Sequence, residues 1–72
     1  MENVQTVEIV VNGESLTFSA GISIADLLTE LGIQGRAIAV EVNEQIQPSS
    51  EFAQRTLLDG DRLEVVTLVG GG

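Results

Sequence analysis

The chain is 72 residues long, which suffices for one small domain and leaves no room for a second hydrophobic core. Hydrophobic residues make up 43% of it, so it can bury a core, but cysteine and histidine are absent, which excludes a disulfide scaffold and the usual structural zinc sites. Eleven acidic residues against three arginines give a net charge of −8, which disfavours nucleic acid and anionic membranes as partners and favours a basic protein surface.

The first predicted element is a β-hairpin over about residues 5–19. Val7, Ile9 and Val11 share one face of its first segment, with the period of a half-buried strand, and the second segment alternates in the same way. Asn12-Gly13 stands between the two segments, and this dipeptide is the strongest short hairpin signal.

A helix follows, and both of its ends are marked in the sequence. Ser23 is a typical N-cap, and Asp26 stands three residues later, where a capping box places an acidic partner. Gly32 suits the left-handed conformation that stops a helix, after which Ile33 folds back in a Schellman motif. The expected apolar stripe between these ends consists of Ile24, Leu27, Leu28 and Leu31.

The second half of the chain predicts three strands. Residues 37–42 alternate as a third strand, and Ile46 lies in a short fourth strand at the sheet edge. Phe52 anchors a loop or single helical turn after it, and an Asp59-Gly60-Asp61 turn leads into the last strand at residues 62–69.

This order of elements predicts an α+β fold with a mixed sheet of four to five strands and one main helix packed across one face. The long connection suits a parallel pairing of the first and last strands, which makes the last strand central. The folded domain is expected at residues 1–69 and a flexible glycine tail at residues 70–72. The expected core residues are Leu27, Leu28, Ile38, Val40, Leu63 and Val65.

The last strand also predicts a partner-binding face. Glu64 marks its solvent side, so Val66 and Leu68, which alternate with it, face outward beside it. Ala37 and Ala39 on the third strand point the same way and are small enough to leave a flat patch. Scattered exposed apolar residues need no explanation by themselves, but this group lies next to the glycine tail.

Three glycines, Gly70, Gly71 and Gly72, follow this strand. They are compatible with an ordinary frayed terminus and also with a working tail, because residues without Cβ atoms thread a narrow channel and approach a phosphate closely. A carboxylate is a poor electrophile. The Gly72 carboxylate would therefore react only after another protein activates it, for instance as an anhydride with a nucleotide phosphate.

Motifs for chemistry by the chain itself are lacking. No serine or threonine has a histidine to activate it, no glycine-rich phosphate loop precedes the helix, and Asp59 and Asp61 lack the spacing of a calcium loop. We therefore expect no enzyme activity and no bound metal or cofactor. An acidic start, apolar runs too short to cross a bilayer and the lack of cysteine predict a cytoplasmic location.

Over nearly its whole length the chain resembles the thiamine-biosynthesis sulfur carrier (ThiS) family of ubiquitin-like β-grasp domains. The segments that carry the resemblance are Val11–Glu14, Ser23–Leu28, Ala39–Asn43, Asp59–Val66 and Val69–Gly72. The chain departs from the family after Pro48, where a basic residue and then tryptophan are common and this chain has Ser49-Ser50 and Phe52.

The resemblance implies a β-grasp fold and a mechanism. A ThiF-type adenylyltransferase, using its own ATP and Mg²⁺, would convert the Gly72 carboxylate to an acyl-adenylate while Gly70 and Gly71 enter its active site. A sulfur donor such as a cysteine desulfurase would then supply the sulfur of a thiocarboxylate, which thiazole synthase (ThiG) would use for the thiazole ring of thiamine. Three alternatives remain open, namely the small subunit of molybdopterin synthase, a ubiquitin-like protein modifier and a plain β-grasp interaction module.

Overall fold

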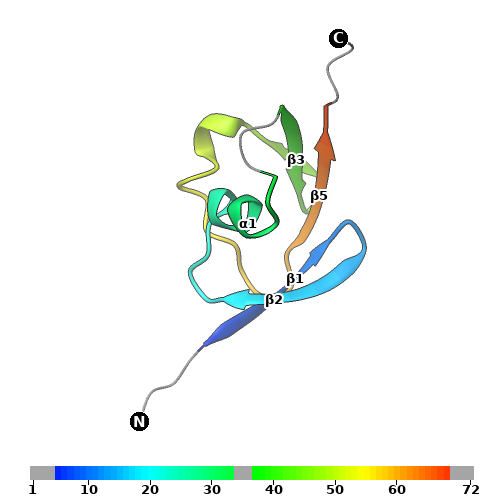
Figure 1. Ribbon diagram of the computed structural model, residues 1–72. Helices are drawn as coiled ribbons and strands as arrows, with labels where there is room; N and C mark the ends of the chain where they lie inside the picture. The colour runs from blue at the N-terminus through cyan, green and yellow to red at the C-terminus, as the bar shows by residue number, and fades with distance from the viewer. Residues whose placement is uncertain (1–4, 34–36, 69–72) are drawn as a thin grey trace.

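The computed structural model describes residues 5–33 and 37–68, which form a two-layer arrangement of one sheet and one helix (Figure 1). The sheet is mixed, with the strand order β2-β1-β5-β3-β4. The elements in chain order are β1 Thr6–Val11, β2 Glu14–Ser19, α1 Ile24–Glu30, β3 Ile38–Val42, β4 Gln45–Gln47, the 3-10 helix η1 Ser49–Glu51 and β5 Arg62–Thr67. The predicted α+β fold, a mixed sheet with one main helix, is confirmed.

The N-terminal hairpin forms where the alternating pattern predicts it. Strands β1 and β2 pair antiparallel along their length, with Val11 opposite Glu14 beside the turn. Asn12 (φ 51°) and Gly13 (φ 85°) both adopt the left-handed region. A two-residue turn of this kind matches the twist of the flanking strands, and asparagine and glycine are among the residues that tolerate it well.

Helix α1 begins and ends as the sequence predicts. The Ser23 hydroxyl accepts a hydrogen bond from the Asp26 N–H (3.0 Å), and the Asp26 carboxylate accepts one from the Ser23 N–H (3.2 Å), which completes the capping box. At the other end the Ile33 N–H donates to the Leu28 carbonyl and the Gly32 N–H to the Thr29 carbonyl. These two bonds define the Schellman motif.

The last strand lies at the centre of the sheet, as predicted. Strand β5 pairs in parallel with β1, where Leu63 lies opposite Val11, and antiparallel with β3, where Val65 lies opposite Val40. Strands β2 and β4 form the two edges of the sheet. The segment that carries the predicted partner-binding face is therefore built on the central strand.

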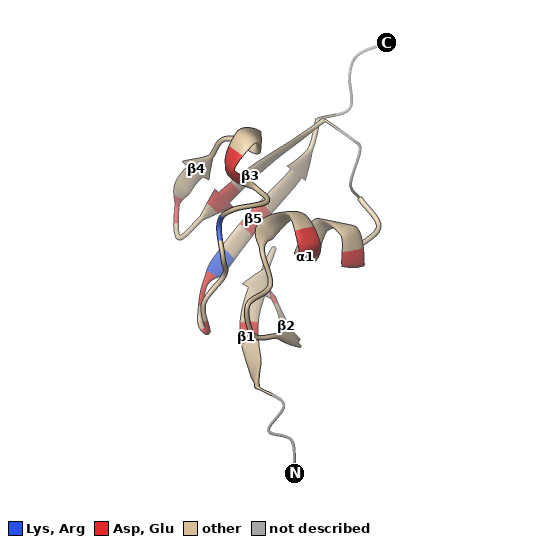
Figure 2. Cartoon of the chain, turned by 90° about the vertical axis from the view of Figure 1, so that its left-hand side faces the viewer, with Lys and Arg blue, Asp and Glu red and all other residues tan. Residues whose placement is uncertain are grey.

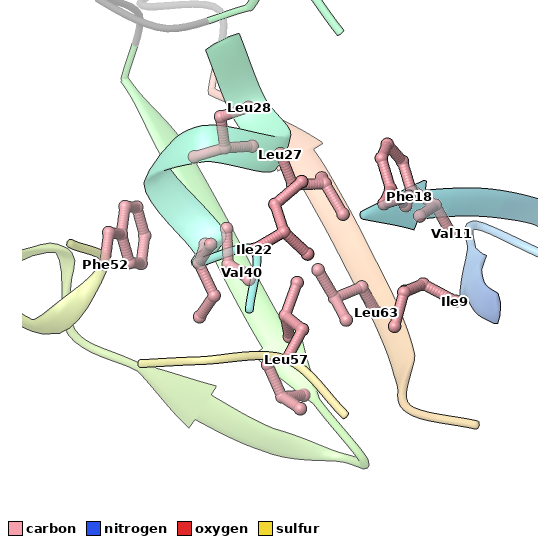
Figure 3. Packing of buried hydrophobic residues seen from close by; sticks show 12 residues of the cluster. Ile9, Val11, Phe18, Ile22, Leu27, Leu28, Val40, Phe52, Leu57 and Leu63 are labelled. Carbon is pink, nitrogen blue, oxygen red and sulfur yellow. The ribbon is translucent and has the colours of Figure 1, made fainter. Parts of the chain in front are cut away.

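One hydrophobic core fills the space between the helix and the sheet (Figure 3). Phe18 and Phe52 close its two ends, and the side chains of Leu27, Val40 and Leu63 lie between them. The buried hydrophobic residues are Ile9, Val11, Phe18, Ile22, Ile24, Leu27, Leu28, Val40, Val42, Phe52, Leu57 and Leu63.

Three side chains are less buried than the sequence predicts, and one is more buried. Ile38 and Val65 are half-buried and pack against the margin of the core instead of lying within it. Leu31 is 36% exposed because it is the C-cap residue, where the chain leaves the helix. Leu57 is 1% exposed although no periodic pattern marks it, and its N–H donates to the Ile22 carbonyl.

Candidate functional site

Strand β5 turns alternate side chains to opposite faces of the sheet, and one of these faces is left uncovered by the helix. Leu63 faces the core and is 1% exposed, whereas Val66 and Leu68 are 53% and 54% exposed. Glu64 is exposed as well. The structure thus places Glu64, Val66 and Leu68 outward, and their role in binding a partner stays a prediction.

Two small residues beside them keep this surface apolar and flat. Ala39 lies opposite Val66 in the β3–β5 ladder, and the Leu68 N–H donates to the Ala37 carbonyl over 2.7 Å. Both alanines are exposed, and neither is large enough to cover its neighbour. Ala37, Ala39, Val66 and Leu68 together form what we call the outer patch.

An acidic border lies directly beside the outer patch. Glu41 of β3 is paired with Glu64 of β5, so two carboxylates oppose each other across the ladder. Like charges in directly opposed positions destabilise a sheet, so this pair is not explained by folding. Ile46 of β4 lies opposite Glu41 and is 74% exposed. Sequence reasoning missed Glu41 and Ile46 as part of this face, because the pairing register that places them there is not visible in a single strand.

A network of polar side chains fixes the start of β5. The Asp61 carboxylate, 7% exposed, accepts hydrogen bonds from the Asn43 Nδ2 (3.0 Å) and the Leu58 N–H (2.8 Å). The Asn43 Oδ1 accepts in turn from the Arg62 N–H (3.0 Å), and the Asp59 carboxylate accepts from a backbone N–H of β1 (2.8 Å). These bonds confirm that both aspartates are turn residues, and they show a role for Asn43 that the sequence did not reveal.

Acidic residues are spread over both layers and are not gathered in one element (Figure 2). Asp26 and Glu30 lie on helix α1, while Glu41 and Glu64 lie on the sheet. Within residues 5–33 and 37–68, no three His, Cys, Asp or Glu side chains are arranged to hold a metal ion. In the same part of the chain, no helix has the length and apolar character needed to span a bilayer.

The three glycines predicted to carry the chemistry, Gly70, Gly71 and Gly72, lie outside the described residues. Their roles, and the division of the chain into residues 1–69 and a tail, stay predictions. What the structure adds is that Leu68, two positions before Gly70, belongs to the outer patch.

Comparison with protein families matches residues 3–72 to the ThiS family. The chain is 48% identical over 65 residues to a thiazole synthase of Paramagnetospirillum magneticum, an alignment that covers 90% of this chain and 20% of that protein. The chain therefore spans about a fifth of that relative's length. It is 38% identical over 61 residues to the sulfur carrier protein ThiS of Thermus thermophilus, covering 85% of this chain and 94% of that one.

The fold is also shared with a solved structure. The crystal structure of the thiamine biosynthesis protein ThiS from Geobacter metallireducens matches with a TM-score of 0.78 and 29% identity. The match covers 92% of this chain and 100% of that one. The two proteins therefore share the same fold.

Proposed function

The chain belongs to the ThiS family of β-grasp domains, and from this we propose that it is a sulfur carrier protein that donates sulfur for the thiazole ring of thiamine. The proposed site is the carboxylate of Gly72, which is converted to a thiocarboxylate and restored after the sulfur has been transferred. The observation that carries the proposal is the outer patch, because Val66 is exposed on the central strand and Leu68 is exposed just after it, two positions before Gly70.

The Gly72 carboxylate must first be activated, because a carboxylate is anionic and resonance-stabilised and therefore resists attack by a nucleophile. One oxygen of the Gly72 carboxylate attacks the α-phosphorus of ATP bound with Mg²⁺ in a ThiF-type adenylyltransferase, and pyrophosphate leaves. The resulting acyl-adenylate carries AMP as a good leaving group on its carbonyl carbon. Gly70 and Gly71 fill the entrance of that active site, since backbone without Cβ atoms fits a narrow channel.

Sulfur then enters at the same carbonyl carbon. A donor such as a cysteine desulfurase holds the sulfur as a persulfide, from which a thiol reductant releases sulfide; the sulfide adds to this carbon and AMP leaves. With sulfide as the nucleophile, the products are the thiocarboxylate and AMP. The chain has no cysteine and needs none, because the sulfur is carried on the backbone terminus.

Docking through the outer patch offsets the cost of ordering the tail. Glycine loses more conformational freedom on ordering than any other residue. Burial of the exposed parts of Val66 and Leu68 stabilises the complex by about 25 cal/mol per Å² of apolar surface. The carboxylates of Glu41 and Glu64 beside them favour a partner with a basic surface.

Thiazole synthase (ThiG) is the proposed acceptor of the sulfur. The relative from Paramagnetospirillum magneticum supports it, because a segment similar to this chain is part of a protein that bears this name. The adenylyltransferase and the sulfur donor are proposed on chemical grounds. We further propose that the chain has no catalytic group of its own and works in the cytoplasm, where ATP for its activation is available.

Transfer of labelled sulfur in a reconstituted system tests this proposal. The chain is loaded with isotopically heavy sulfide by the adenylyltransferase, ATP and Mg²⁺, separated from small molecules, and given to thiazole synthase with its other substrates. We expect the label in the thiazole product and a restored carboxylate on the recovered chain. Label that never leaves the chain, or covalent adducts between the chain and lysines of other proteins, would favour the ubiquitin-like modifier instead.

A further inference from the structure

The support that strand β1 gives to β5 ends at Leu63, the second residue of β5. The two strands pair in parallel up to Val11, which lies opposite Leu63. The chain then turns at Asn12-Gly13 and runs back as β2. No further pair joins β1 to β5, so residues 64–67 lack a neighbouring strand on this side within the described part of the chain.

The side chain of Asn12 takes the place of that missing strand. The Asn12 backbone N–H donates to the Leu63 carbonyl over 2.8 Å. Its Oδ1 accepts from the Val65 N–H over 2.8 Å, and its Nδ2 donates to the Val65 carbonyl over 3.1 Å. A carboxamide presents the same donor and acceptor as a peptide group, so Asn12 extends the ladder by one more residue of β5.

The opposite side of β5 is held throughout by β3. The Arg62 carbonyl accepts from the Asn43 N–H and the Leu68 N–H donates to the Ala37 carbonyl, both over 2.7 Å. Even-numbered residues of β5 therefore direct their backbone groups to β3, and odd-numbered residues direct theirs to the side of β1. On the β1 side the Asn12 carboxamide bonds to the backbone of Val65, the residue directly before Val66 of the outer patch.

The turn itself does not require the carboxamide. Asn12 has a φ of 51°, a conformation that glycine adopts at least as easily. Its two side-chain bonds reach a residue 53 positions away, so they serve the strand and not the local turn.

We infer that Asn12 is a positioning residue of the carrier, one whose carboxamide fixes β5 at Val65, beyond the reach of β1, and thereby presents the outer patch to the activating enzyme. This inference rests on the proposed function. Asn12 itself lies at the hairpin turn, away from the glycines in sequence, and acts through Val65.

Asn12→Gly tests this role, with Asn43→Gly as its matched control. Asn43 also has a positive φ (52°) and also makes two side-chain bonds to the β5 region, but these hold Asp61 and Arg62 at the start of the strand. Both replacements keep the turn and remove two bonds. Amide hydrogen exchange measured by NMR on the isolated chain should accelerate about tenfold at Val65 in Asn12→Gly only.

Steady-state thiocarboxylate formation then measures the functional consequence. Asn12→Gly should raise the KM for the carrier by about threefold to tenfold and leave kcat unchanged, because fewer molecules present an ordered patch but those that dock react normally. Asn43→Gly should leave both constants unchanged. Asn12→Asp keeps the oxygen that accepts from the Val65 N–H and loses the donor, so its KM should lie between those of the wild type and Asn12→Gly.

Two results would overturn the inference. One is an unchanged exchange rate at Val65 in both Asn12 variants, and the other is an equal rise in KM for Asn12→Gly and Asn43→Gly at equal melting temperature. A wild-type chain that forms no thiocarboxylate would instead overturn the proposed function and the kinetic part of the inference with it. The exchange rates would in that case still decide whether Asn12 holds β5.

Discussion

Replacement of Leu68 by alanine should weaken docking to the adenylyltransferase by an amount that follows from its exposure. Leu68 is 54% exposed in the free chain, so roughly half of the about 1.5–3 kcal/mol gained by burying a leucine is still available to an interface. Its removal should cost about 0.8–1.6 kcal/mol, which raises Kd about 4- to 15-fold. Leu68→Asp should cost more, because a carboxylate would have to be desolvated on the same face as Glu64.

Leu58 supplies the matched control for this prediction. It is 64% exposed and precedes β5, so it lies at the opposite end of that strand from Leu68. Isothermal titration calorimetry should show weaker binding for both Leu68 variants and an unchanged Kd for Leu58→Ala and Leu58→Asp. Equal weakening by the Leu58 and Leu68 variants, or wild-type affinity of Leu68→Asp with an unchanged melting temperature, would refute the role given to the outer patch.

Three further predictions concern the core, the helix cap and the charge. Leu63→Ala should lower the free energy of unfolding by about 2–5 kcal/mol, since Leu63 is 1% exposed, and a urea titration with a loss below about 0.5 kcal/mol would contradict its packing. Ser23→Ala should cost about 1 kcal/mol through loss of the capping box, and thermal unfolding at the wild-type temperature would count against that bond. The net charge of −8 should make stopped-flow association with the adenylyltransferase slower as salt is raised, whereas salt-independent rates would argue against a basic partner surface.

Much of the fold was predictable because local signals in the sequence agree with the tertiary structure. The hairpin depends on alternation around Asn12-Gly13, and the helix depends on a capping residue, Ser23, and a stop residue, Gly32. Each of these signals acts between residues close in sequence. The outward placement of Val66 and Leu68 was predictable for the same reason, since a strand alternates its side chains regardless of its neighbours.

Two kinds of feature could not be predicted: how deeply each side chain is buried in the folded domain, and which residues distant in sequence make contact. Ile38 and Val65 alternate like core residues, but they only pack against the margin of the core and are half-buried. Leu57 is buried because the path of a loop carries it under the helix start, and a loop path has no periodicity. The hairpin turn is enough to explain an asparagine at position 12, so the sequence gives no sign that its side chain also bonds to Val65.

The acidic border illustrates a further limit. The alternation in each strand predicts that Glu41 and Glu64 face solvent. Only the register of β3 against β5 shows that the two residues lie opposite each other. The same register adds Ile46 to this face through its pairing with Glu41. The proposed partner-binding face thus depends on the pairing register of the sheet, which no single strand contains.

The most direct test of the proposed carrier chemistry is intact-protein mass spectrometry after incubation with the adenylyltransferase, ATP, Mg²⁺ and sulfide. The wild-type chain should gain the mass difference between sulfur and oxygen, and fragmentation should place the gain at Gly72. A chain that lacks Gly72 should gain nothing at an unchanged melting temperature, because the shortened tail withdraws its carboxylate from the attacking position. Thiocarboxylate on the Gly72-deleted chain at the wild-type rate, or none on the wild-type chain, would contradict the assignment of Gly72 as the sulfur-carrying residue.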